Sequence, residues 1–260
     1  MIGYKIAKHG EKRVVVTLEI PSDALTNMSR SSVEVKETAK YRTNKAKVLK
    51  IEDIEGNCYS TATSFNYDKK SLDYKVGELI EEPTYNTDPE EVGAEGIHYF
   101  LNRRVAELYG LYKIANGLFE QWCNNGQKLL EYSYVDGKVH GLYQSWHTNG
   151  QKWVECSYVY GKPHGLYQAW YKNGQKWMEY SFVDGNLHGL YQLWFENGQK
   201  EEECAYVDGK IHGLCQEWHA NGQKEVECFH ENGMKHGLYQ EWDEGGVKIK
   251  EVTYVNGVRQ

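Results

Sequence analysis

Apolar and polar residues alternate along the second half of the chain, and the alternation has a fixed period. Residues 140–163 read HGLYQSWHTNGQKWVECSYVYGKP, and residues 164–187 read HGLYQAWYKNGQKWMEYSFVDGNL. In both segments, two alternating runs flank an Asn-Gly pair. Alternation with a period of two is typical of strands. We therefore predict that each such repeat forms two antiparallel strands.

The spacing of marker residues gives the number of repeats. Tryptophan recurs at a constant step at positions 122, 146, 170, 194, 218 and 242, and glutamate recurs with the same step at 131, 155, 179, 203, 227 and 251. His-Gly-Leu begins at 140, 164, 188, 212 and 236. The sequence thus predicts six repeats without insertions. A half unit at residues 106–113 precedes them, because Glu107 lies one period before Glu131.

The Asn-Gly pair predicts how the two strands of a repeat are joined and paired. Asn-Gly between two apolar-rich runs favours a type I′ hairpin, whose central residues both need a positive φ. A turn at Asn149-Gly150 would pair Trp146 with Trp153, Gln144 with Glu155 and Leu142 with Ser157 on one face. The other face would pair Ser145 with Val154, Tyr143 with Cys156 and Gly141 with Tyr158. A second turn signal, Asp-Gly-Lys, leads into the next repeat.

Successive repeats are expected to pair edge to edge in one long meander. A single-layer sheet has no ordinary core, so its stability must come from side-chain ladders, each pair contributing about 0.2–1 kcal/mol. The positions predicted to maintain this structure are Gly141, Gly165, Gly189, Gly213, Glu155, Glu179, Asn149 and Gly150.

The first hundred residues carry no repeat. Strands are expected at 14–21, 45–53, 57–67 and 95–101 from their β-branched content and partial alternation, and Asn102 fits a helix N-cap. The predicted fold is mainly β. A small α+β domain at residues 1–105 precedes an elongated single-layer antiparallel β-meander of six repeats at residues 106–260.

Composition and charge narrow the classes of function. The chain has 26 Gly, 21 Tyr and 8 Trp among 260 residues, which favours strands. It lacks both a secretory signal and an apolar run long enough to span a membrane, so we expect an intracellular, cytoplasmic protein. Residues 106–260 contain 14 basic and 20 acidic side chains and thus carry −6 of the net charge of −7. Nucleic acid is therefore not an expected partner, and membrane association is disfavoured.

Three groups of residues could carry chemistry. Cys156, Cys204 and Cys228 occupy one repeat position, roughly 9.5 Å apart, which is too far for a disulfide, so reduced thiols are expected. The same spacing prevents the repeated histidines from meeting at one metal ion, and we expect them to cap backbone carbonyls at turns. The glutamate column has no asymmetry that would separate an acid from a base. We predict no catalytic, cofactor-binding or metal site.

The repeat anchors resemble the MORN repeat variant, as in bacterial repeat proteins described as antitoxins and in giant-virus MORN-repeat proteins. The resemblance covers about residues 106–260 through the pattern GxxHGLYxxWxxNGQKxxExxYxxGxxHG. It implies a curved β-meander with a scaffold or binding role and implies no catalysis.

A second resemblance covers roughly residues 1–109. LEIP, KAKVLKIE, YKVGE and EGIHYFLNRRVAELY, in that order, are similar to a domain of unknown function that occurs in giant-virus and phage proteins. Where a cysteine is expected before Gly-Ile-His, this chain has Val92-Gly93-Ala94-Glu95. A metal or redox role at that position is therefore not supported.

The expected function is a non-enzymatic protein-interaction scaffold, with a giant DNA virus as the source that the resemblance implies. Its location would be the host cytoplasm or the virion, with no obligate small molecule. The predicted partner-binding surface consists of Trp146, Trp170, Trp194, Trp218, Tyr143, Tyr167, Tyr191 and Tyr239, with the open edge near Tyr254 as a second site. Two alternatives stay open: an antitoxin-like protein, or a targeting arm for an enzymatic first domain with a pocket around His98 and Tyr99.

Overall fold

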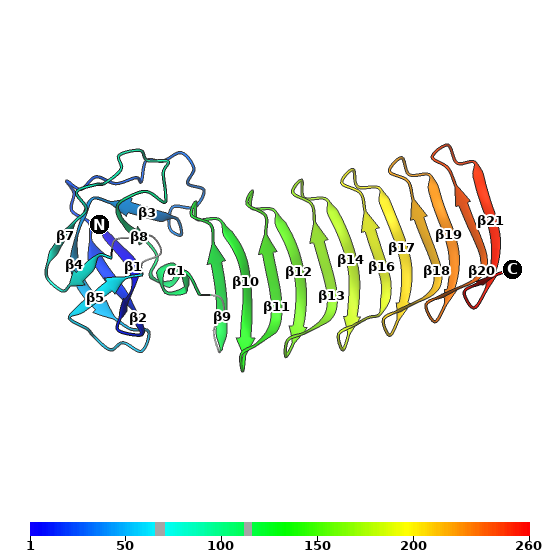
Figure 1. Ribbon diagram of the computed structural model, residues 1–260, viewed down its shortest axis with the longest axis horizontal. Helices are drawn as coiled ribbons and strands as arrows, with labels where there is room; N and C mark the ends of the chain where they lie inside the picture. The colour runs from blue at the N-terminus through cyan, green and yellow to red at the C-terminus, as the bar shows by residue number, and fades with distance from the viewer. Residues whose placement is uncertain (66–70, 112–115) are drawn as a thin grey trace. The chain divides into compact units, whose positions relative to one another are not determined.

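The computed structural model describes residues 1–65, 71–111 and 116–260, and strands dominate it (Figure 1). The chain forms two compact units. The head unit comprises residues 1–112 and 120–129, and the array unit comprises residues 113–119 and 130–260. The predicted domain boundary after residue 105 stays a prediction.

The head unit contains an eight-stranded sheet. Its main strand order is β3-β8-β1-β2-β4-β7, and β5 pairs with both β1 and β6. The strands are β1 (Ile2–His9), β2 (Lys12–Glu19), β3 (Lys40–Thr43), β4 (Lys45–Glu52), β5 (Thr61–Ser64), β6 (Asp73–Lys75), β7 (Leu79–Glu81) and β8 (Ile97–Phe100). The strands expected at 14–21, 45–53, 57–67 and 95–101 correspond to β2, β4, β5 and β8. Residues 66 and 67 lie outside the described residues.

The core of the head unit lies around β2. Val14, Val15 and Val16 are all buried, because β2 is paired on both sides and covered on both faces. A strand buried on both faces has a continuous apolar run in place of alternation. Tyr41 from β3 and Ile97 from β8 complete this core.

Helix α1 (Arg103–Leu108) begins after Asn102, as predicted. The Asn102 side chain accepts hydrogen bonds from the backbone N–H groups of Arg104 and Val105, which satisfies donors at the start of the helix. Glu107 lies inside this helix and pairs with Arg103 at 2.8 Å, so it does not occupy a strand position. The predicted half unit is therefore wrong at Glu107, and Tyr112 and Lys113 lie outside the described residues.

The turn of the first repeat is bound within the head unit. The backbone N–H groups of Glu34 and Val35 donate to the Asn125 carbonyl at 2.9 and 3.1 Å, and Lys40 N–H donates to the Asn124 carbonyl at 3.0 Å. Gly126 has a φ of 92°, and a Cβ there would lie 2.0 Å from the Val35 carbonyl oxygen. Only glycine permits this close approach.

The repeats form one antiparallel sheet of 14 strands (Figure 1). Neighbouring strands follow the chain order from β9 to β22, except that the short β15 pairs only with β14. The strands are β9 (Gly117–Trp122), β10 (Lys128–Val135), β11 (Lys138–Trp146), β12 (Lys152–Val159), β13 (Lys162–Trp170), β14 (Lys176–Val183), β15 (Asn186–Leu187), β16 (Gly189–Trp194), β17 (Lys200–Val207), β18 (Lys210–Trp218), β19 (Lys224–Glu231), β20 (Met234–Trp242), β21 (Lys248–Val255) and β22 (Val258–Arg259). The predicted fold class is confirmed.

Five of the six predicted cross-strand pairs between β11 and β12 occur. The pairs are Gly141–Tyr158, Leu142–Ser157, Tyr143–Cys156, Gln144–Glu155 and Ser145–Val154. The predicted pairing of Trp146 with Trp153 is wrong. The register shifts after Ser145, so Trp146 lies opposite Lys152. A two-residue turn would keep the register, whereas the observed loop adds a residue.

The Asn-Gly turn of each repeat has a type other than the one expected. At the Asn149-Gly150 turn, His147 N–H donates to the Gln151 carbonyl and Gly150 N–H donates to the His147 carbonyl. Of the two turn residues, only Gly150 has a positive φ, 85°. This is a three-residue loop with a glycine bulge, not a type I′ turn. The type I′ geometry occurs at the other link, where Asp136 and Gly137 have φ values of 51° and 70°.

The glycine of His-Gly-Leu also lies in the left-handed region, which alternation does not reveal. Gly141, Gly165, Gly189, Gly213 and Gly237 have φ values between 77° and 102°. The register between successive repeats shifts nearby, at Cys156–Tyr158 on the facing strand. This glycine is therefore needed for its backbone conformation in addition to its lack of a side chain.

We predict that Gly165→Ala destabilises the array by about 1–2 kcal/mol. A Cβ at Gly165 meets no atom within 4 Å, so the loss would come from the φ of 77° and not from a clash. Gly165→Asn is the matched control, because asparagine enters the left-handed region more readily. Urea unfolding of the full chain measures both variants. An alanine variant as stable as the asparagine variant would contradict the conformational argument.

Candidate interaction surface of the repeat array

One face of the array carries a ladder of glutamine, glutamate, lysine and tryptophan. We name it the glutamate face. Gln144 Nε2 donates to Glu155 Oε2 at 2.6 Å, and Lys152 Nζ donates to the same oxygen at 2.6 Å. The Lys152 ammonium also lies 5.4 Å from the centre of the Trp170 ring in the next repeat. The same glutamine–glutamate bond recurs at 168–179, 192–203, 216–227 and 240–251.

This ladder keeps its glutamate carboxylates ionised and partly covers its tryptophan rings. The Lys152 hydrogen bond, followed by that of Gln144, lowers the pKa of Glu155, and the same partners in the next repeat lower the pKa of Glu179. The tryptophans predicted to bind a partner, Trp146, Trp170, Trp194 and Trp218, are half-buried. Lysines lie over the rings of Trp170, Trp194 and Trp218. The ladder accordingly has a structural role in the five repeats that carry the glutamine–glutamate bond.

A column of exposed leucines runs along the glutamate face, and sequence analysis did not single it out. Leu118, Leu142, Leu166, Leu190, Leu214 and Leu238 are 41–51% exposed. Small residues lie opposite several of them, such as Ser157 opposite Leu142 and Ser181 opposite Leu166. A serine is too short to cover a leucine. The repeated Leu–Ser pairing is the sequence signal that could have identified this column.

The opposite face is a packed aromatic layer, which we name the tyrosine face. Tyr167 and Tyr180 stack with ring centres 4.6 Å apart and an interplanar angle of 3°, and Tyr180 stacks on Tyr191 at 5.3 Å. Burial raises the pKa of Tyr191 to about 12, and Glu202 contributes to the shift. Of the predicted partner-binding tyrosines, Tyr239 is buried, and Tyr143, Tyr167 and Tyr191 are half-buried. These rings cover one another and replace a second layer.

Asparagine side chains connect the turns of successive repeats. Asn149 Oδ1 accepts from the Gln151 N–H at 3.1 Å, and Asn149 Nδ2 donates to the Lys172 carbonyl at 2.7 Å. Equivalent bonds run from Asn173, Asn197 and Asn221 to the following repeat. The asparagine predicted as a turn residue thus also holds adjacent turns together.

The repeated histidines do not cap carbonyls where their contacts are defined. His140 Nδ1 accepts a hydrogen bond from the Tyr160 N–H at 3.4 Å, and His212 Nδ1 accepts one from the Asn232 N–H at 3.5 Å. The predicted carbonyl capping is therefore wrong for these two residues. They instead satisfy a donor of the type I′ turn one repeat later.

The edge near Tyr254 is not open. Tyr254 pairs with Arg259 of β22, and the Gln260 N–H donates to the Thr253 carbonyl at 2.9 Å. The chain turns back after Gly257 and covers this part of β21. Tyr254 itself therefore has no free backbone groups for strand addition, because the last strand of the sheet at this point is β22.

The head unit contains a cavity of about 780 Å³. Basic side chains of Lys5, Arg13 and Lys40 line it together with the Glu120 carboxylate, His98 and aromatic rings such as Phe100. Burial lowers the pKa of Lys5 to about 8, with a further contribution from the Lys40 ammonium. His98 Nε2 lies 2.8 Å from the Val92 carbonyl oxygen. Because that oxygen can only accept a hydrogen bond, Nε2 carries the proton.

The environment of His98 is unfavourable for acid–base chemistry near neutral pH. Burial, with the nearby Lys40 and Lys5 ammonium groups, lowers the pKa of His98 to about 3. Tyr99, expected beside it, is completely buried in the core and does not line the cavity. The histidine of the cavity is therefore a weak base.

Family comparisons match both parts of the chain. The MORN repeat variant matches residues 139–160, 163–184, 187–208, 211–232 and 235–256. Five of the six repeats match the MORN repeat variant. The Family of unknown function (DUF5758) matches residues 1–106. Both resemblances expected from the sequence are confirmed, and no curated protein matches the chain.

The MORN repeats suggest a role in protein or membrane interaction and are a non-catalytic repeat type. No helix among the described residues is long and apolar enough to cross a membrane.

The first hairpin, β9 and β10, lies outside the five matched segments. It departs from the others at Glu120, which takes the place of glutamine and pairs with Lys128 at 2.7 Å.

The net negative charge of the array arises in its C-terminal part. Residues 106–195 contain 7 acidic and 7 basic side chains, whereas residues 196–260 contain 13 acidic and 7 basic ones. The difference of −6 therefore arises entirely in the later repeats. A basic partner would be attracted to this part of the array.

A disulfide joins Cys204 and Cys215, whose Cα atoms are 4.2 Å apart. The expectation that the cysteines are reduced is therefore wrong for this pair. The spacing of roughly 9.5 Å applies only to cysteines at the same repeat position. Cys215 occupies a tyrosine position and lies directly opposite Cys204 on the neighbouring strand. Cys58, Cys123, Cys156 and Cys228 are free thiols.

We predict that Glu179→Gln makes the array less stable at pH 7 by about 0.5–1 kcal/mol. Because the pKa of Glu179 is lowered in the folded state, its contribution is present above the unfolded pKa, about 4.3, and is lost as the pH falls through the folded pKa. The variant should therefore lose less stability than the wild type between pH 7 and pH 3.

Urea unfolding at several pH values measures this difference. Glu196→Gln is the control, because Glu196 is exposed and lies outside the glutamate ladder. Equal pH dependence of the wild type and Glu179→Gln would contradict the role of the ladder.

Proposed function

We propose that this protein is a non-enzymatic scaffold whose MORN repeats bind another protein. The observation that carries the proposal is the leucine column, which exposes one large apolar side chain at the same place in six successive repeats. Repeated exposed apolar side chains with a polar surround are typical of interaction surfaces. The half-buried Trp146, Trp170, Trp194 and Trp218 lie on the same face and would form the floor of the contact.

The spacing of the leucines favours an amphipathic helix as the bound element. Successive leucines are separated by two strands, roughly 9.5 Å. On a helix, residues seven positions apart are separated by about 10.5 Å. A helix that crosses the strands could place one apolar side chain beside each leucine. Basic residues toward one end of that helix would match the acidic repeats after residue 195.

Support is weaker for the tyrosine columns as a docking surface. Tyr143, Tyr167, Tyr191 and Tyr239 each pack against another ring of the tyrosine face, and exposing them would disrupt the aromatic layer. We therefore assign them a supporting role and place the partner on the glutamate face.

We predict that the triple variant Leu166→Ser, Leu190→Ser and Leu214→Ser weakens partner binding by more than about tenfold, because anchoring apolar residues each contribute over about 1 kcal/mol. The matched control is Tyr143→Phe, Tyr167→Phe and Tyr191→Phe on the opposite face, which retains the rings. Proximity crosslinking in native lysate, followed by titration of the identified partner, provides the measurement. Circular dichroism checks that each variant is folded.

A second triple variant, Trp146→Ala, Trp170→Ala and Trp194→Ala, tests the tryptophan floor. Undiminished partner binding by both the leucine and the tryptophan variants would reject the glutamate face as the interaction surface.

The proposed source of the protein and the antitoxin-like alternative rest on the resemblance to known repeat proteins. We propose a giant DNA virus as the source, with the protein in the host cytoplasm or the virion, and proteomics of purified particles tests this location. An antitoxin-like protein would be a special case of protein binding. Rescue from growth arrest in co-expression with a neighbouring toxin distinguishes it.

A second candidate function belongs to the head unit, and the basic cavity is the observation that favours it. Lys5, Arg13 and Lys40 beside aromatic rings fit a small anionic ligand such as a nucleotide. This would give the head unit a binding role beside the scaffold.

We predict that pyrophosphate or a nucleoside triphosphate raises the melting temperature of the full chain, whereas an uncharged nucleoside does not. Lys5→Met should remove the shift, because it removes a cation from the cavity wall. Lys47→Met, an exposed substitution outside the cavity, is the control. A nucleoside that stabilises as strongly as the triphosphate would argue against an anion site.

A further inference from the structure

The repeats at residues 188–211 and 212–235 replace the tyrosine-face pattern with metal-binding residue types. Cys215 occupies the position of Tyr167 and Tyr191 and lies opposite Cys204 on one side and Cys228 on the other. Glu202 occupies the position of Met178, and Glu217 the position of Leu193. Three departures from the repeat thus coincide on two neighbouring strands, β17 and β18.

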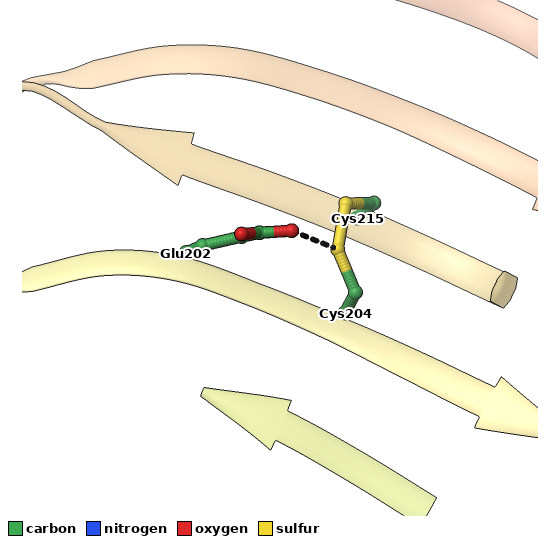
Figure 2. A group of neighbouring side chains, drawn as sticks. All are labelled: Glu202, Cys204 and Cys215. Carbon is green, nitrogen blue, oxygen red and sulfur yellow. Dashed lines mark hydrogen bonds between the residues drawn. A yellow bond between two sulfur atoms is a disulfide. The ribbon is translucent and has the colours of Figure 1, made fainter. Parts of the chain in front are cut away.

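The side chains at this point converge. The Glu202 carboxylate oxygen lies 3.3 Å from Cys204 Sγ, and one ligand atom each of Glu202, Cys204 and Cys215 lies within 4.8 Å of the other two (Figure 2). Cys204 is fully buried, and Cys215 is 6% exposed. No other group of three such ligand residues occurs in the described part of the chain.

Two glutamate carboxylates lie on the same two strands as the Cys204–Cys215 pair. Glu202 pairs directly with Glu217 across β17 and β18. Like charges in directly opposite positions destabilise a sheet. A bound divalent cation would offset this repulsion, whereas a disulfide alone does not.

We propose that Glu202, Cys204 and Cys215 form a binding site for Zn²⁺ or a similar thiophilic divalent cation when the disulfide is reduced. Two thiolates and a carboxylate are ligand types that zinc accepts in tetrahedral sites, where three protein ligands leave one position for water. The disulfide is the closed form of the same site, because its sulfur atoms are bonded to each other.

The disulfide is converted to the metal-binding dithiol by thiol–disulfide exchange with a dithiol reductant. The reductant gives two electrons and two protons to the Cys204–Cys215 bond, which becomes two thiols, and the reductant becomes a cyclic disulfide. Zn²⁺ then replaces the two thiol protons, which pass to solvent. A small-molecule disulfide reverses the step: it takes two electrons from the two thiolates and two protons from solvent, becomes two thiols, re-forms the Cys204–Cys215 bond and releases the metal. Metal binding therefore reports the redox state of the array.

The test uses the full chain, reduced with a dithiol and then freed of reductant without oxygen. Titration with Co²⁺ should give one bound equivalent and thiolate-to-cobalt absorption in the near ultraviolet, and Zn²⁺ should displace the cobalt. Cys204→Ser and Cys215→Ser should abolish the absorption. Glu202→Gln should weaken Zn²⁺ binding by at least about tenfold, because even outer-sphere partners contribute roughly 10–100-fold.

Cys156→Ser is the matched control. Cys156 is a buried thiol at the same repeat position as Cys204, but it faces Tyr143 and Tyr167 in place of another cysteine. It should leave cobalt and zinc binding unchanged. Circular dichroism of each reduced variant separates loss of a ligand from loss of the fold.

Three results would overturn the proposal. The first is a reduced wild type that binds no Zn²⁺. The second is binding that survives Cys204→Ser and Cys215→Ser. The third is a disulfide that the dithiol cannot open while the array remains folded, as measured by counting free thiols.

Discussion

The structure of the array depends on the fact that a single-layer sheet has no second layer to cover it. The only cover that a side chain can have comes from its neighbours within the sheet. On the tyrosine face, rings such as Tyr167 and Tyr180 cover each other by stacking. On the glutamate face, Lys152 joins Glu155 to the Trp170 ring of the next repeat. Identical repeats are the simplest sequence in which each aromatic ring and each glutamate finds such a neighbour.

The same constraint limits what the array can do chemically. Equivalent residues of successive repeats are separated by two strands, roughly 9.5 Å, which is too far to share a metal ion or a proton. Only direct cross-strand partners approach within bonding distance. In most repeats those partners are glutamine with glutamate or tyrosine with an apolar residue. Convergent chemistry therefore requires a departure from the repeat, as at Cys204 and Cys215.

The period, the strand pairing and most of the register could be predicted from the sequence, because the constant spacing of the tryptophans and glutamates fixes them. The pairing of Trp146 and the turn types could not, because a bulge and a left-handed glycine change the register without changing the alternation. The Cys204–Cys215 pair was readable in principle from the predicted register. The prediction missed this pair because it considered cysteines at equivalent positions of successive repeats and not the residue opposite Cys204 on the neighbouring strand.

The head unit was less predictable, because its structure depends on contacts without a period. The backbone of residues 34–40 binds the turn around Asn125, and no sequence pattern links these segments. The cavity was also not predictable in detail, because Lys5, Arg13 and Lys40 come from three different strands or strand ends. Their convergence arises only when β1, β2 and β3 take their places in the sheet.

The exceptions to the repeat carry more functional information than the repeat itself. The leucine column is present in every repeat and gives the glutamate face a uniform apolar stripe. The excess acidic charge and the disulfide are both confined to residues 196–260. A uniform stripe cannot determine the direction in which a helix lies across it, since every position is equivalent. The acidic repeats remove that equivalence, because a helix with one basic end binds better in one direction than in the other.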